Sequence, residues 1–436
     1  MTILPVRAAS GFTRAGRPFA VWRGAVVRTG PVLAHRLEWR RAQKMRKCFG
    51  GRRSARRPMT RPRLLIISFS DISADARVLK QVKLFAGRYD VTTYGYGPSP
   101  DPRVRHLQLD DSYDIRRWRR SDLILRRFRR VYWGQPAIRQ AKADLEDDGR
   151  FDVILADDID TVGLALALNP VKGVHADIHE YAPRQNEEIL VWRIFIAPFV
   201  RWMCRQFLPR AASMTTVGQG IADEYRRAYG LRAGVVTNAA PYFELTARPV
   251  GSPIRLVHSG ASIRNRRLEV LIDAVAATTS DVTLDLYLMG NNPEYIEELR
   301  DRAAGSGQVR FPNPAAYADL IALLNGYDVG IVVIPPTNFN NRWTLPNKFF
   351  DYVQARLGLI IGPSPEMKSI LDAHGFGAVA DDFGAAALTR VLNSLTADQV
   401  RDWKTRASTA ARELSSEAQV ELWATAVEAL VNRVDT

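Results

Sequence analysis

Short apolar runs alternate with helical patterns along most of this chain. The first series of such runs lies at residues 64–68, 89–98, 151–158, 174–181, 213–218 and 233–240. Each run is followed by a helical pattern or a polar loop. A strand that is buried on both faces reads as a continuous apolar run, and a helix between successive strands implies parallel pairing. The series therefore predicts a parallel sheet with helices on both faces.

The alternation then starts again after a loop-like stretch at residues 240–253, which we interpret as an interdomain linker. The second series of strand-like runs lies at 253–260, 282–290, 309–313, 327–336, 358–362 and 376–380. Residues 397–434 read as two amphipathic helices without a strand between them. A chain of 436 residues is too long for one ordinary core. The prediction is an α/β fold of two doubly wound, Rossmann-like domains, with a ligand cleft at the carboxyl ends of both sheets.

The net charge of +15 is concentrated at the beginning of the chain. Residues 1–63 hold 17 of the 61 Lys and Arg residues and only one acidic residue, Glu38. The body is close to neutral, so nucleic acid is not expected as a partner. The arm has three interpretations. It is a disordered extension or an artefact of the choice of start codon, since Met45 and Met59 precede the first strand. Alternatively, it binds an anionic membrane surface, or it binds nucleic acid. The predicted units are residues 1–61 (arm), 62–245, 246–412 and 413–436 (crossover helix).

The two cysteines, Cys48 and Cys204, cannot form a disulfide framework, and neither lies in a cluster with His at metal-ligand spacing. The arm has no uninterrupted apolar core, which argues against a secretory signal. No apolar run in the body is long enough to span a bilayer. We expect a cytoplasmic protein, with peripheral attachment to the inner face of the plasma membrane as a further expectation.

Two segments suggest that a membrane surface is a partner. Residues 115–133 hold eight arginines interleaved with Trp, Leu, Phe and Tyr. Residues 189–210 place Arg193, Arg201 and Arg205 along one side of an apolar helix that contains Trp. Basic amphipathic helices of this kind bind anionic headgroups. For the second segment, core packing with arginine side chains that reach the solvent is the favoured alternative.

Several motifs, taken in order, resemble the retaining, nucleotide-sugar-dependent GT-B glycosyltransferases of family 4, in particular the polysaccharide-type members. The opening "SFSDISADARVLKQVKLFAGRYDVTTYGYG" (68–97) is similar to the first βα unit of that family. The stretches "ADIHEYAPRQ" (176–185), "HSGASIRNRRLEVLIDAV" (258–275) and "LPNKFFDYVQARLGLIIG" (345–362) resemble its His-Glu loop, its first donor-domain unit and its donor helix. The resemblance covers about residues 62–432.

The resemblance implies a donor site on the helix that follows Pro346. Asp351 takes the place of the family's ribose-binding Glu, and Trp343 replaces its companion Glu, which leaves the sugar open. The diphosphate would bind cations and the N–H groups of a helix N-terminus. The implied donor-binding residues are Arg264, Arg266, Gly290, Asn292, Thr344, Leu345, Asn347, Lys348 and Asp351. The alternatives are a solvated i,i+3 pair of Lys348 with Asp351, an exposed basic turn at the arginines, and a simple strand-end turn at Gly290.

On the acceptor side, His179 and Glu180 follow a strand and precede Pro183. The resemblance implies that this loop faces the reacting centre, with His179 as a hydrogen-bonding or positioning group and Glu180 as the base candidate. The alternative is a structural loop histidine. Weaker acceptor-side candidates are Asp71, Asp75 and Arg77, of which Asp75 also fits a helix cap. The acids at 156–160 form a cluster without a neighbouring His or further carboxylates in the sequence, and Asp158 is interpreted as a helix cap rather than a metal ligand.

The resulting hypothesis is a hexosyltransferase-type glycosyltransferase that moves a sugar from a nucleotide sugar to a hydroxyl of a glycan or lipid-linked glycan, with retention of configuration. No cofactor or metal is expected, because no pair of aspartates at ligand spacing ends a donor-domain strand. Two rivals stay open. One is a nucleotide-sugar epimerase with the same fold, and the other is a non-enzymatic membrane or nucleic-acid adaptor.

Overall fold

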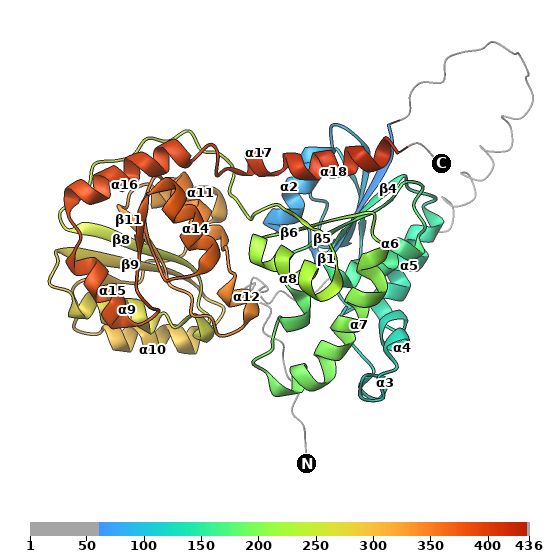
Figure 1. Cartoon of the computed structure of the whole chain (residues 1–436), viewed down its shortest axis with the longest axis horizontal. Helices are drawn as coiled ribbons and strands as arrows, with labels where there is room; N and C mark the ends of the chain where they lie inside the picture. The colour runs from blue at the N-terminus through green and yellow to red at the C-terminus, as the bar shows by residue number, and fades with distance from the viewer. Residues whose placement is uncertain (1–60, 434–436) are drawn as a thin grey trace, which may run out of the picture. The chain divides into compact units, whose positions relative to one another are not determined.

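Two parallel β-sheets organise the part of the chain that the computed structural model describes, residues 61–433 (Figure 1). The arm predicted at residues 1–61 lies outside this part, apart from Arg61. Neighbouring strands of the first sheet pair in parallel throughout. Its seven strands are, in spatial order, β3 (Arg105–Gln108), β2 (Asp90–Tyr96), β1 (Arg63–Asp71), β4 (Val153–Asp157), β5 (Gly173–Ile178), β6 (Ser213–Thr216) and β7 (Gly234–Val235).

The second sheet repeats this plan. Its six strands are, in spatial order, β10 (Val309–Arg310), β9 (Val282–Met289), β8 (Ile254–Ala261), β11 (Val329–Val332), β12 (Gly358–Ile361) and β13 (Gly377–Val379). Residues 236–253 form neither helix nor strand between the two sheets. In each sheet the strand order reverses next to the first strand of the series, at β1/β4 and at β8/β11. This is the doubly wound topology that the sequence predicted, and in such sheets ligands bind outside the carboxyl ends of the strands at this point.

The helices connect and cover the strands of each sheet. Those of the first half are α2 (Ala76–Phe85), α3 (Arg120–Ile124), α4 (Phe128–Trp133), α5 (Pro136–Asp147), α6 (Ile159–Ala167), α7 (Ala197–Phe207) and α8 (Gln219–Tyr229), with the short turns η2 (Ala182–Arg184), η3 (Trp192–Ile196) and η4 (Leu208–Arg210). Those of the second half are η5 (Arg264–Arg266), α9 (Glu269–Ala277), α10 (Pro293–Ala303), α11 (Tyr317–Leu324), α12 (Phe339–Arg342), α13 (Asn347–Gln354), α14 (Pro365–His374), α15 (Ala385–Asn393) and α16 (Ala397–Ala410).

Both faces of the first sheet are buried, which explains the continuous apolar runs. Side chains alternate between the faces of a strand. Leu65 and Ile67 of β1 therefore belong to the core under α5, α6 and α7, whereas Leu64 and Ile66 belong to the core under α2. The second sheet divides its apolar residues in the same way between two cores.

The end of the chain returns to the first sheet. After α17 (Ser416–Gln419), the helix α18 (Glu421–Val431) buries Trp423, Val427 and Leu430 in the same core as Val78 and Val82 of α2. The Trp423 indole N–H also donates a 3.2 Å hydrogen bond to the Thr215 hydroxyl of β6. The predicted crossing back of the C-terminal helices is thus confirmed, because apolar residues of α18 complete a core that α2 covers only in part.

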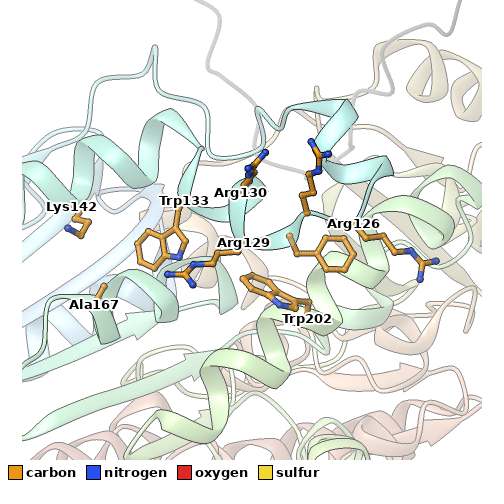
Figure 2. A pocket seen from close by; sticks show the side chains of 9 residues that line it. Arg126, Arg129, Arg130, Trp133, Lys142, Ala167 and Trp202 are labelled. Atoms are coloured by element: carbon orange, nitrogen blue, oxygen red, sulfur yellow. The ribbon is translucent and has the colours of Figure 1, made fainter.

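The arginine-rich segment 115–133 is not one amphipathic helix. It forms the two short helices α3 and α4, and Arg126, between them, has a positive φ of 52° that interrupts the helical path. Within 189–210, η3 is a π-helical turn, and α7 buries Phe199, Met203 and Phe207, so core packing holds for that helix. Residues of α4 and α7 line one pocket (Figure 2). Among the described residues, none of the helices combines the length and apolarity that a membrane crossing needs.

Candidate functional site

The helix α13 carries two charged side chains into the interior. Phe349 and Phe350 are almost fully buried and fix which face of the helix points inward. Lys348 and Asp351, one turn apart, are carried inward with them and are buried as well. The surface-pair alternative for these two residues is therefore wrong, because neither side chain is exposed to solvent. No side chain caps the first turn of α13.

The Lys348 ammonium is held by a histidine that sequence analysis did not select. Its Nζ lies 3.0 Å from His258 Nε2, and His258 Nδ1 lies 2.9 Å from the Ile331 carbonyl oxygen. A carbonyl only accepts, so Nδ1 carries the proton and Nε2 accepts a hydrogen bond from the ammonium. A Cβ at Gly260, whose φ is +131°, would lie 2.9 Å from Lys348 Nζ. Glycine is needed there, and Lys348 has a fixed position.

A second cation, Arg266 of η5, lies close enough to Lys348 to influence it. Burial lowers the pKa of Lys348 well below its ordinary value, and the Arg266 charge lowers it further. Burial also lowers the pKa of Arg266 itself. Within residues 61–433, neither side chain has a carboxylate oxygen within the 4.0 Å of an ion pair, although the more distant Asp351 partly offsets the charge of Lys348. A buried lysine and a half-buried arginine without a close carboxylate are suited to bind an anion.

Asp351 completes this group with a carboxylate that lacks a hydrogen-bond donor. Its Oδ1 atom is buried and has no hydrogen-bond partner among the described residues. Burial raises the pKa of Asp351 to about 7, against the opposing charges of Lys80 and Lys348. Lys80 comes from α2 of the first half and donates to the Ala239 carbonyl. Since a buried oxygen without a donor is costly, the arrangement suits a ligand that donates hydrogen bonds.

The other donor-side candidates are engaged elsewhere or unconstrained. Arg264 is exposed and forms a bidentate ion pair with Glu298, with both N–O distances 2.5 Å, which corrects its expected role at the diphosphate. Asn292 caps α10 through the Tyr295 N–H, so the turn interpretation accounts for it. A Cβ at Gly290 would meet nothing within 4 Å. Three further candidates precede or begin α13, namely Thr344 (half-buried), Leu345 (buried) and Asn347 (exposed).

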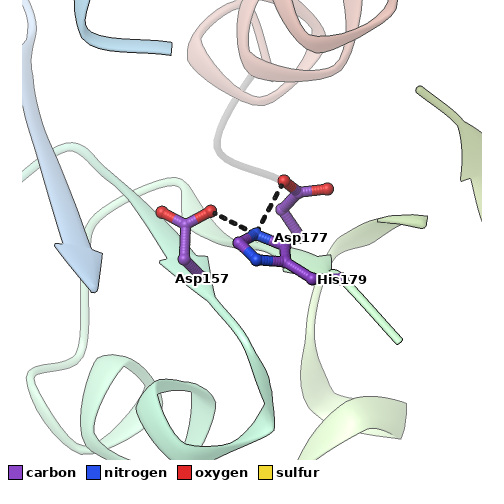
Figure 3. A group of neighbouring side chains, drawn as sticks. All are labelled: Asp157, Asp177 and His179. Carbon is purple, nitrogen blue, oxygen red and sulfur yellow. Dashed lines mark hydrogen bonds and ion pairs between the residues drawn. The ribbon is translucent and has the colours of Figure 1, made fainter. Parts of the chain in front are cut away.

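The acceptor-side histidine lies among three aspartates at the ends of β4 and β5, two of which, Asp157 and Asp177, are drawn in Figure 3. His179 Nε2 is 3.2 Å from Asp157 and 3.5 Å from Asp177, and its Nδ1 is 3.5 Å from Asp158. Burial disfavours the imidazolium, but the Asp158, Asp157 and Asp177 carboxylates outweigh it and raise the pKa of His179 well above its ordinary value. The expectation that the acids at 156–160 lack a neighbouring His or further carboxylates is wrong, because Asp157 and Asp177 are paired in register across adjacent strands.

Asp177 is held by residues of the protein rather than left free for a ligand. Arg77 binds both of its carboxylate oxygens at 2.7 Å, and Thr215 Oγ1 donates a further bond of 2.7 Å. Arg77 is itself buried, and its guanidinium lies 4.7 Å from the centre of the Trp423 ring. This corrects the expectation that Arg77 contacts the acceptor, because its donors are used inside the first half.

The group of Asp157, Asp177 and His179 also has the spacing of a metal site. Each offers one ligand atom, and these atoms lie within 4.8 Å of one another. The donor set fits a metal poorly, because Arg77 already neutralises Asp177 and the imidazole is drawn toward its charged form by the carboxylates. We interpret the group as an ion-pair network that fixes the loop after β5.

The remaining acidic candidates have local roles. Asp158 precedes α6 with a φ of 62°, but its side chain does not cap the helix and instead accepts the His179 N–H at 3.1 Å, which corrects the cap interpretation. Asp75 caps α2 through the N–H groups of Arg77 and Val78. Asp71 is exposed and accepts from the backbone and hydroxyl of Ser73 in the turn after β1.

The environment of Glu180 raises the pKa of its carboxyl group. It is half-buried, and burial, followed by the Asp158 charge, raises the pKa of Glu180 to about 7. Its Oε2 lies 3.4 Å from Asn340 Nδ2 of α12, and the Asn340 side-chain oxygen accepts the Tyr181 N–H at 2.9 Å. Since α12 precedes α13 by only a few residues, these contacts join the acceptor-side loop to the segment that carries Lys348 and Asp351.

Comparisons with known proteins place this geometry in a known fold. The sequence matches no protein-family profile and no curated protein. Among solved structures, HepE from Anabaena in complex with UDP is similar with a TM-score of 0.62 at 12% identity, over 84% of this chain and 100% of that chain. Sucrose-phosphate synthase from Thermosynechococcus elongatus is similar with a TM-score of 0.65 at 14% identity, over 85% of this chain and 99% of that chain. The chain therefore has the GT-B fold of these glycosyltransferases.

Proposed function

We propose that this chain is a nucleotide-sugar-dependent glycosyltransferase of the family 4 type that transfers a hexosyl group to a hydroxyl of a glycan or lipid-linked glycan, with retention of configuration. The observation that supports it most is the pair of cations formed by the buried Lys348 and the half-buried Arg266, which lack a carboxylate within ion-pair distance in the described residues. Asp351, with its partnerless oxygen, lies on the same helix. A diphosphate and a ribose diol are complementary to these two features.

In the proposed complex the phosphate oxygens accept hydrogen bonds from Lys348 and Arg266, and Asp351 accepts from the ribose hydroxyls. The solved relatives include a complex with UDP and a complex with UDP-glucose. UDP is therefore the first nucleotide to test. Charge-assisted hydrogen bonds of this kind contribute about 1.5–3 kcal/mol each, which is enough for micromolar affinity with backbone help.

The proposed transfer needs no protein nucleophile. The acceptor oxygen forms a bond to the anomeric carbon while the bond from that carbon to the diphosphate oxygen breaks, on the same face. The departing diphosphate takes the electron pair, stabilised by Lys348 and Arg266, and the acceptor proton passes to that oxygen or to Glu180. His179, held among three carboxylates, orients the loop that carries Glu180. We predict that no metal ion is required.

The experiment is a calorimetric titration of UDP, GDP and other nucleoside diphosphates, followed by incubation of the matching sugar nucleotide with candidate acceptors. Expected are one nucleotide bound in the micromolar range, product that depends on acceptor, activity in EDTA, and an α-linked product from an α-linked donor. A changed sugar on the nucleotide without acceptor would instead identify an epimerase. Absence of binding to every nucleoside diphosphate would favour an adaptor. Rescue by manganese after chelation, or a β-linked product, would contradict the mechanism.

A further inference from the structure

One surface of the first half combines exposed aliphatic side chains from two segments. Among the described residues, five of the nine exposed large hydrophobics come from these segments: Ile124 (59% exposed), Leu125 (58%), Leu190 (57%), Val191 (45%) and Ile194 (48%). The two segments are in contact, since α3 packs against η3. We call these five residues the apolar ridge.

The ridge is exposed although the segments that carry it are firmly packed. Leu123 and Trp192, their neighbours in sequence, are buried in the core of the first half. Trp118 packs edge-on against Phe199 of α7, with the ring centres 6.1 Å apart, and Phe128 packs against the same ring at 5.8 Å. The outward direction of the ridge residues is thus set by inward anchors on the same segments. A rigid, exposed aliphatic surface of this kind indicates an interaction site.

Arginines precede and follow the ridge residues Ile124 and Leu125 in the chain, and almost all of these arginines lack an acidic partner in the described residues. Residues 116–130 contribute eight arginines, each with an exposed side chain. Within the part of the chain that the structure describes, only Arg127 among the eight has a carboxylate within 4 Å, that of Asp122 at 3.7 Å. The positive charge at this surface is therefore largely uncompensated by the protein.

A pocket adjoins the ridge in the chain, because its lining begins at Arg126, the residue after Leu125 (Figure 2). It has a volume of about 860 Å³, and its lining includes Arg126, Arg127, Arg129, Arg130 and Lys142 together with the indoles of Trp133 and Trp202. No acidic residue lines it. Lys142 is paired with Glu146 at 2.7 Å and Arg127 with Asp122 at 3.7 Å, which leaves Arg126, Arg129 and Arg130 as the cations available to an anion. Arginine guanidinium groups bind phosphate through paired hydrogen bonds.

We propose that this surface docks on a bilayer that contains anionic phospholipids, with the apolar ridge in the interfacial region and a headgroup phosphate in the arginine pocket. The combination selects this partner. Binding of a soluble anion does not require exposed aliphatic side chains. Proteins bind single-stranded nucleic acid with cationic and aromatic side chains rather than with Leu and Ile. Docking of a second copy of the chain on the same surface would bring the eight arginines of one copy against the eight of the other, and like charges repel. Indole and aliphatic groups beside arginines are typical of interfacial membrane contacts.

The surface also leads toward the candidate acceptor side. Leu190 follows Glu180 by ten residues, in the segment that runs from the loop after β5 through η2 to η3. Arg116, the first of the eight arginines, is near enough that its charge counters the rise in the pKa of Glu180. A lipid-borne acceptor would therefore approach from the side where the base candidate lies. The docking proposal itself does not rest on sugar transfer, because vesicle binding is measured without nucleotide.

The first test is vesicle sedimentation with the full chain, using phosphatidylcholine alone or mixed with phosphatidylserine. Arg126→Ser/Arg129→Ser should weaken binding to the anionic vesicles roughly 30-fold, since each basic group near an anionic surface contributes a factor of about five. The matched control, Arg232→Ser/Arg401→Ser, has the same net charge change at exposed positions elsewhere and should weaken binding far less. Equal losses in the two double variants, or equal binding to neutral vesicles, would overturn the proposal.

The second test locates the ridge and separates it from the basic arm. Leu190→Cys is labelled with an environment-sensitive fluorophore in a chain that also carries Cys48→Ser, which removes a second labelling site. Cys204 needs no substitution, because it is buried. Anionic vesicles should shift the emission to the blue, whereas a label at Val171→Cys, 40% exposed and outside the ridge, should not respond. No shift at residue 190, an equal shift with double-stranded DNA, or a shift caused by dimerisation without vesicles would each contradict membrane docking.

Discussion

The two halves of the molecule treat buried charge in opposite ways. In the first half, Arg77 and His179 meet the aspartates Asp157 and Asp177 at distances of 2.7–3.5 Å, so positive and negative groups are matched. In the second half, the buried Lys348 lies within electrostatic reach of the half-buried Arg266, and no carboxylate lies within ion-pair distance of either in the described residues. The first group lies at the carboxyl ends of β4 and β5, whereas Arg266 and Lys348 lie on segments that follow β8 and β11 of the second sheet.

The difference separates a structural network from a binding site. A matched buried ion pair stabilises the fold only as long as both partners are present, because removal of one leaves the other as a buried charge without a counter-charge or solvent. An unmatched buried cation costs free energy in the empty protein, and a bound anion recovers it. We therefore expect substitutions in the first group to reduce stability and substitutions in the second to reduce affinity.

The largest effect is expected from Arg77→Met. The substitution leaves Asp177 buried without its bidentate partner, which typically costs about 3–5 kcal/mol. Urea unfolding should show this as a lower transition midpoint with an unchanged slope. A loss below about 1 kcal/mol would mean that the network of the first half is not a stabilising element and would remove the contrast between the halves.

Lys348→Met should separate affinity from stability. Loss of a charge-assisted contact should weaken UDP binding about 100-fold in calorimetry, whereas the free energy of unfolding should stay equal or rise, because an unpaired charge leaves the interior. Lys404→Met is the matched control, since Lys404 is equally buried but paired with Asp328 at 3.1 Å. The control should lose stability and keep its UDP affinity. The reverse outcome would assign Lys348 to the fold rather than to the donor.

Asp351→Ala should weaken UDP binding about tenfold, because its carboxylate is proposed to accept from the ribose diol. Asp351→Glu should retain more affinity than the alanine variant. The sharper control is the ligand: 2′,3′-dideoxy-UDP lacks the donors, so the alanine substitution should hardly change its affinity. Equal losses with both nucleotides would show that Asp351 acts through the charge or packing of the site, and the ribose assignment would be wrong.

The sheets could be predicted from the sequence because their central strands are apolar on both faces. Strand β3, Arg105–Gln108, was not predicted, since this edge strand has no apolar run to mark it. The break in segment 115–133 was also missed. It occurs at Arg126, with no Gly or Pro to announce it, and tertiary packing of Trp118 and Phe128 on α7 decides the path of the chain.

The candidate site was only half visible for a related reason. Lys348, Asp351 and Arg266 were suggested by motif resemblance, but the partner of Lys348, His258, is 90 residues away in an apolar strand. Likewise, Asp157 and Asp177 meet only through the register of β4 and β5, which the strand order determines and composition does not. Placing the acids at the ends of consecutive strands in a 3-2-1-4-5 order would have been the signal to use.

The smallest expected effect is the pH dependence of the matched network. His179 has a pKa well above its ordinary value of about 6.5, because the aspartates around it favour the imidazolium. Its stabilisation is therefore fully present below about pH 6.5 and declines as the pH rises through the higher pKa of the folded state. Burial raises the pKa of Asp157 to about 7, so Asp157 becomes protonated as the pH falls below that value. Asp158 and Asp177 then remain as the carboxylates that stabilise the imidazolium. His179→Gln should cost about 1 kcal/mol at pH 6 and less at alkaline pH, as read from urea unfolding at several pH values. A cost that grows with pH would show that the histidine is neutral in the folded protein, and the first group would then resemble the second in carrying unmatched charge.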